Sequence, residues 1–187
     1  DIANPYFRSR ERQRTMEEKG IKVFHNSFGY DITQDLPALS AAIKAPLEDK
    51  EFMTVVDAGG DDSGARVLHQ FKKYFLDDDC EMLFVINGNR PETSTVDGCI
   101  DHMNRIMAET GLEIKGILNN THLLSETSVN DIIKGVELCK DVSAKTGIPF
   151  VESYCDERML AKMDPEALVG LKIKPISLFL RPSWLQY

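Results

Sequence analysis

Residues 82–120 read MLFVINGNRPETSTVDGCIDHMNRIMAETGLEIKGILNN, and this stretch decides the fold. It contains two short apolar runs, 82–86 and 114–118, with a segment of helical length between them. In that segment, residues 93–110, apolar side chains recur at spacings of three and four, which is typical of an amphipathic helix. Apolar strands that alternate with such helices predict βαβ units and a parallel sheet covered on both faces.

The same alternation continues on both sides of this stretch. Further strands are expected at 21–24, 52–56, 148–151 and 173–180. Further helices are expected at 8–19, 35–47, 63–76, 128–145 and 164–171. The predicted architecture is one α/β domain over residues 1–187, with three layers (α/β/α) around a mainly parallel sheet. In such sheets, ligands bind beyond the carboxyl ends of the strands.

The composition is that of a globular domain. The chain is 42% hydrophobic and 28% charged, and its formal net charge is −8. An acidic chain without a basic run carries no strong signal for nucleic-acid binding. No apolar stretch approaches the roughly 20 residues that a membrane-spanning helix needs. We therefore expect no membrane-spanning segment and no large basic surface for nucleic acid, although a local basic patch stays open.

The cysteines indicate a reducing compartment. The four of them, Cys80, Cys99, Cys139 and Cys155, form no C-x-x-C pair and have no histidine cluster beside them. We therefore expect reduced thiols, two of them on helices, and no metal site of the zinc type. Together with the absence of a signal-peptide pattern, this predicts a cytoplasmic protein.

Residues 55–62, VVDAGGDD, place an acid at the end of an apolar strand and a glycine three residues later. This is the arrangement of a Walker B strand and its switch loop. Asp57 would hold Mg²⁺, and Gly60 would let its backbone N–H approach a γ-phosphate. The alternative interpretation is a glycine-rich turn followed by a helix whose first turn is acidic.

Two other strand ends carry polar residues. One of them is residues 86–95, INGNRPETST. This segment has two interpretations: a loop that contacts phosphate or a switch, and a loop whose polar residues cap the next helix. In residues 116–121, GILNNT, two amides are suited to the edge of a purine, although Asn-Asn is also ordinary turn chemistry. The scattered histidines form no hydrolase triad, and His69 and His102 are expected to be ordinary surface or boundary residues on helices.

Taken in order, these motifs resemble the MinD/ParA/CobQ-like branch of P-loop ATPases, the deviant Walker A group, over about residues 1–155. The resemblance implies that Asp1 is the second acid of a D-x-D pair and positions the attacking water. It implies Asp57 as the magnesium and catalytic residue and Gly60 as the γ-phosphate contact. Asn119 or Asn120 would contact adenine, with Asn119 preferred.

The resemblance implies an ATP- and Mg²⁺-dependent protein that hydrolyses slowly and acts as a molecular switch, or as a maturation or partitioning factor. A homodimer and a protein partner are expected with it. The chain has no G-K-[ST], so we expect that the first strand and the phosphate loop lie upstream of Asp1. Two alternatives stay open: an ATP-dependent ligase or synthetase of the same fold, and a non-catalytic interaction domain.

The carboxyl-terminal segment, residues 172–185, has an apolar run, a proline turn and the only tryptophan. It is interpreted as an edge strand packed on the core or as a docking surface.

Overall fold

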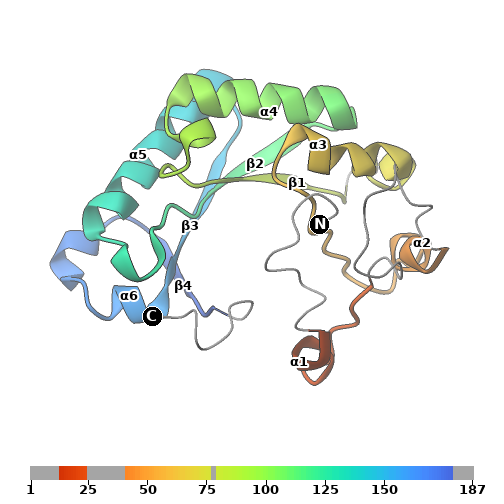
Figure 1. Cartoon of the computed structure of the whole chain (residues 1–187), viewed down its shortest axis with the longest axis horizontal. Helices are drawn as coiled ribbons and strands as arrows, with labels where there is room; N and C mark the ends of the chain where they lie inside the picture. Colours follow the sequence, from red (N-terminus) through yellow and green to blue (C-terminus); the bar gives the residue numbers. More distant parts are fainter. Residues whose placement is uncertain (1–12, 25–40, 77–78, 179–187) are drawn as a thin grey trace.

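The computed structural model describes residues 13–24, 41–76 and 79–178. Its central element is a sheet of four strands that lie side by side in chain order (Figure 1). Every pairing in this sheet is parallel. The strands are β1 (Met82–Ile86), β2 (Ile114–Asn119), β3 (Phe150–Asp156) and β4 (Ile173–Ile176). The predicted α/β class with a parallel sheet is confirmed, and the flanking helices are consistent with a three-layer fold.

Two long helices connect the first three strands. They are α4 (Val96–Thr110) and α5 (Val129–Thr146), and Figure 1 shows both along one face of the sheet. Each helix begins at a hydroxyl residue that caps its first turn, Thr95 for α4 and Ser128 for α5. Each ends at a glycine with positive φ, Gly111 for α4 and Gly147 for α5, which stops the helix.

The remaining helical segments are short. Within the described residues, the predicted helix 63–76 is a short α-helix, α3, continued by the 3₁₀ helix η2. The expected helix 164–171 is a single 3₁₀ turn, η5. The full set is α1 (Gln13–Glu17), α2 (Ala41–Glu48), α3 (Asp62–Ala65), η2 (Arg66–Tyr74), η3 (Pro91–Thr93), η4 (Leu124–Glu126), α6 (Glu157–Leu160) and η5 (Pro165–Leu168).

Two predicted strands, 21–24 and 52–56, are wrong. Both segments lie among the described residues, and neither is a strand or pairs with another described strand. In the second, Met53 is 93% exposed and Val55 is 84% exposed, although both are large and apolar. A strand-length apolar run becomes a strand only where a neighbouring strand accepts its backbone hydrogen bonds, which a local pattern does not contain.

The sheet has one packed face and one face with exposed apolar side chains. Phe84 and Ile86 of β1 are buried in a core cluster shared with α4 and α5. The alternate residues Leu83 and Val85 are 41% and 53% exposed. A Cβ on Gly116 in β2 would come within 2.8 Å of the Leu83 side chain and 2.7 Å of that of Val151 in β3. The glycine therefore lets these two side chains close over the middle of β2.

Candidate functional site

Asn119, the last residue of β2, is part of the protein interior. Its side chain is among the most buried, with the residue 1% exposed. Its amide donates to the hydroxyl of Ser153 in β3 over 3.1 Å, and its carbonyl oxygen accepts from the backbone N–H of Thr121 over 3.0 Å. The amide nitrogen and the carbonyl oxygen of Asn119 therefore each make a hydrogen bond inside the protein.

Helix α5 packs tightly over this polar pair. A Cβ on Gly135 would fall well inside van der Waals contact with both Thr121 Oγ1 and Asn119 Oδ1. Only glycine allows the helix backbone to approach so closely. The end of β2 is thus fixed between β3 and α5.

The loop after β1 is joined to the loop after β2. Asn87 donates from its side-chain amide to the carbonyl of His122 over 3.4 Å and accepts from the N–H of His122 over 3.3 Å. The N–H of Gly88 donates to Thr121 Oγ1 over 2.9 Å. Asn120 extends the ladder, because its N–H donates to the carbonyl of Ile86 over 2.8 Å. The segments that follow β1 and β2 are therefore joined by side-chain and backbone hydrogen bonds.

Asn120 differs from Asn119 in exposure. It is half-buried, and its backbone rather than its side chain joins the two strands. Of the two predicted adenine contacts, Asn120 has the more accessible amide.

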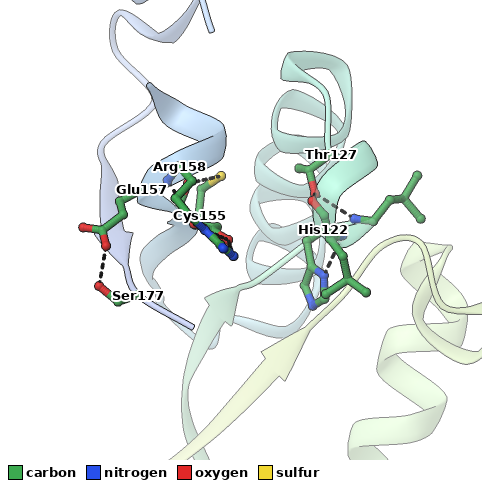
Figure 2. Close-up of polar contacts among 9 residues, drawn as sticks. His122, Thr127, Cys155, Glu157, Arg158 and Ser177 are labelled. Carbon is green, nitrogen blue, oxygen red and sulfur yellow. Dashed lines mark hydrogen bonds and ion pairs between the residues drawn. The ribbon is translucent and has the colours of Figure 1, made fainter. Parts of the chain in front are cut away.

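The loop from His122 to Thr127 folds on itself (Figure 2). His122 Nδ1 accepts from the N–H of Leu124 over 3.3 Å, and Thr127 Oγ1 accepts from the N–H of Leu123 over 2.9 Å. Leu124 has φ of +57°, a conformation that non-glycine residues rarely adopt. These contacts hold the strained residue beside the carboxyl end of β2.

Three polar residues, Asn89, Asp131 and Lys134, connect the loop after β1 to α5. Asn89 donates to Asp131 over 2.9 Å and accepts from Lys134 over 3.2 Å. Burial by itself raises the pKa of Asp131, but hydrogen bonds from Ser128 and Asn89 and the charge of Lys134 outweigh it. The pKa of Asp131 therefore lies below its ordinary value, and the carboxylate is stabilised in the charged form.

The turn that carries Asp57 and Gly60 is compact. The backbones of Gly59 and Gly64 touch, since a Cβ on Gly59 would lie 2.5 Å from Gly64 Cα. Asp61 caps α3 by accepting from the N–H of Gly64 over 2.6 Å. Asp57 is exposed, and nothing lies within 4 Å of the position that a Cβ on Gly60 would take. The backbone at Gly60 is therefore accessible.

The prediction for His102 is wrong. It was expected to be an ordinary surface or boundary residue, but it is 7% exposed, and its Nε2 lies 2.7 Å from the carbonyl oxygen of Gly60. Helix α4 thus contacts the glycine turn directly. The sequence places His102 on a helix but carries no signal for a partner that lies 42 residues away.

The sequence also missed the polar residues at the end of β3. The expected strand 148–151 extends instead to Asp156, so the edge lies beyond Glu152, which pairs with Lys174 over 2.6 Å. Arg158 pairs with Asp156 over 2.7 Å and lowers the pKa of that carboxyl.

Figure 2 shows a second contact at this end of the sheet. Ser177, after β4, donates to Glu157 over 2.6 Å.

None of the four cysteines forms a disulfide bond. Cys99 on α4 and Cys139 on α5 are buried, as is Cys155 on β3. Across the described ranges, no group of three or more His, Cys, Asp or Glu residues is arranged to hold a metal ion. No helix in the same ranges is both long and apolar enough to cross a membrane.

Asp1 lies outside the described residues, and so do residues 179–185 of the carboxyl-terminal segment. Comparisons of the chain with protein-family models, with curated proteins and with solved structures found no match. The P-loop resemblance therefore stays a prediction that rests on the motifs themselves.

Proposed function

We propose that this chain belongs to a P-loop ATPase of the MinD/ParA/CobQ-like group, which binds Mg·ATP, hydrolyses it slowly and acts as a switch on a protein partner. The observation that carries the proposal is the turn from Asp57 to Gly60. It combines an exposed carboxylate with an accessible glycine backbone next to a parallel sheet. An anion such as a terminal phosphate is bound by backbone N–H groups of this kind.

The described sheet leaves the edge at β1 open. Ligands bind in parallel sheets where the strand order reverses, and β1 to β4 follow chain order without a reversal. Within the described sheet, β1 has a neighbour on one side alone. The unpaired run 52–56 precedes α3, whose Ala65 shares the core of β1. A further parallel strand at that edge would pair with β1.

Asp57 suits a magnesium ion. Mg²⁺ is commonly held by one or two carboxylates together with phosphate oxygens and water, and Asp57 offers an exposed carboxylate. The ion would neutralise charge on the phosphates. Gly60 would donate its N–H to the terminal phosphate, and Asn120, whose amide is more accessible than that of Asn119, would contact adenine. Asp1 would orient the attacking water. Nucleotide binding would promote formation of a homodimer, and the partner protein would respond to that dimer.

The proposal requires a phosphate-binding loop from residues outside this sequence, because the 187 residues contain no G-K-[ST]. The test is calorimetric titration of Mg·ATP into the longest natural form of the protein, with the 187-residue chain as control. We expect binding by the long form and none by the control. Absence of binding by both forms would overturn the proposal.

A second candidate is a non-catalytic interaction domain. It is favoured by the exposed apolar side chains on the open sheet face, Leu83, Val85 and Val151. Parallel sheets are normally covered on both faces. A long form that binds no nucleotide but is retained by a partner through this face would support it.

A further inference from the structure

His102 links α4 to the glycine turn by a defined set of contacts. Its Nε2 lies 2.7 Å from the carbonyl oxygen of Gly60, and its Nδ1 lies 3.2 Å from Nη2 of Arg105. Its ring packs against that of Phe84 in β1, with 5.8 Å between the ring centroids. The imidazole therefore touches the turn, its own helix and the sheet.

The two hydrogen-bond partners determine the tautomer of His102. A guanidinium only donates, so Nδ1 accepts from Arg105. A carbonyl only accepts, so Nε2 carries the proton and donates to Gly60. Arg105 is itself paired with Asp101 over 3.3 Å. This series of contacts along α4 keeps the Nε2–H directed at the turn.

The contact orients a peptide unit. The carbonyl of Gly60 belongs to the planar peptide that it shares with Asp61, in which C=O and N–H point in opposite directions. When the carbonyl faces His102, the N–H of Asp61 faces away from α4. Gly60 adopts many backbone conformations at low cost, and the space beside its Cα is open. Without His102, this peptide unit would have little to hold it.

The other side of the turn is already anchored. Gly59 packs on Gly64, and the carboxylate of Asp61 is held by the N–H of Gly64. The Gly60–Asp61 peptide lies between this anchor and His102.

We propose that His102 is a positioning residue that orients the Gly60–Asp61 peptide and thereby determines which backbone N–H groups the turn presents to the terminal phosphate of a nucleotide. The phosphate part of this inference rests on the proposed function. The ordering of the turn does not, and it is tested separately on the chain without nucleotide.

The first experiment measures amide hydrogen exchange of residues 59–64 in the 187-residue chain. His102→Phe keeps the ring against Phe84 but removes the donor, and we expect exchange about tenfold faster, the effect of one lost hydrogen bond. His102→Gln retains a side-chain N–H and should restore most of the protection. His69→Phe, at an exposed histidine of η2, is the matched control and should leave the turn unchanged.

Circular dichroism verifies that each variant folds, and His102→Leu replaces His102→Phe if the latter does not. Unchanged exchange in the donor-free variant, or equal exchange in the Phe and Gln variants, would overturn the positioning role.

The second experiment compares nucleotides in the long form. With His102→Phe, we expect Mg·ATP to bind about tenfold more weakly and Mg·ADP to be unchanged, because only ATP has the terminal phosphate. Equal losses for both nucleotides would assign His102 a merely structural role. If the wild-type long form binds neither nucleotide, the proposed function and the phosphate role are both wrong, while the exchange experiment still decides whether His102 orders the turn.

Discussion

The amide of Asn119 at the end of β2 donates to the hydroxyl of Ser153 in β3, so two neighbouring strands are joined by side chains as well as by their backbones. The pair is buried, and the remaining amide oxygen of Asn119 holds the N–H of Thr121. Because unpaired polar groups are costly inside a protein, this contact stabilises the fold at the edge where a ligand would bind.

Replacing Asn119 with alanine should destabilise the protein by about 1–3 kcal/mol, because Ser153 and the N–H of Thr121 would lose their partner. Urea unfolding followed by circular dichroism measures the change. Asn120→Ala is the matched control and should lie within about 0.5 kcal/mol of wild type. Equal effects of the two substitutions would contradict the assignment of Asn119 to the interior.

Gly135→Ala should destabilise the protein by about 1–3 kcal/mol, because the new methyl group would overlap Thr121 and Asn119. At a helix position without close neighbours, the same change would stabilise the protein by about 1 kcal/mol. The sign of the change in stability therefore shows whether α5 is tightly packed at Gly135. Thermal unfolding gives the sign. Lys140→Ala, on the exposed face of α5, should be nearly neutral, and a more stable Gly135→Ala protein would show that the helix is not tightly packed there.

The buried thiols should resist alkylation. Burial raises the pKa of Cys99 to about 11 and that of Cys139 to about 12, and burial together with Asp156 raises the pKa of Cys155 to about 11. At pH 8 these thiols stay protonated, so iodoacetamide should modify them only after unfolding. Mass spectrometry of native and urea-unfolded samples tests this, with Cys80→Ser removing the less buried thiol. Fast labelling of Cys139 in the native protein would be inconsistent with this burial.

Asp131 should contribute to stability in a pH-dependent way. Its pKa is lower in the folded protein than its ordinary value, so its contribution is present above about pH 4 and is lost as the pH falls through the folded pKa. Asp131→Asn should therefore flatten the loss of stability between neutral and acid pH. Urea unfolding at a series of pH values measures the slope, and Asn130→Ala controls for substitution in the same turn. An unchanged slope would exclude this role.

Asp57→Ala tests the proposed function. In the long form, Mg²⁺-dependent ATP binding should weaken about tenfold or more and hydrolysis should be lost, since the carboxylate would hold the ion. Asp62→Ala removes a nearby acid in the first turn of α3 and should retain both activities. Calorimetry with and without EDTA separates the magnesium effect from nucleotide affinity. Unchanged Mg²⁺-dependent ATP binding and hydrolysis in Asp57→Ala would contradict the assignment of Asp57 to the magnesium site.

Much of the fold could be predicted from local patterns. The βαβ alternation of β1, α4 and β2 follows from apolar runs and helical spacing, and the expected helices 93–110 and 128–145 begin and end within three residues of α4 and α5. These signals lie within a few residues of the structure that they specify, so no distant contact is needed to interpret them.

The candidate site was predicted less completely. The sequence indicated which segments follow the strands, and Asn87 and His122 do join two of them. It did not separate Asn119 from Asn120, because the difference depends on Ser153, which lies 34 residues away. It likewise missed Asp156 and Arg158, because β3 extends beyond its apolar residues.

The sequence by itself determined the strand–helix alternation from β1 to β3 and the polar character of the strand ends. Tertiary structure alone decided that 52–56 is unpaired among the described residues, that Asn119 is an interior residue and that His102 holds Gly60. The physical reason is that periodicity and capping are properties of neighbouring residues. Strand pairing, burial and hydrogen bonding between α4 and the glycine turn instead depend on groups brought together only by folding.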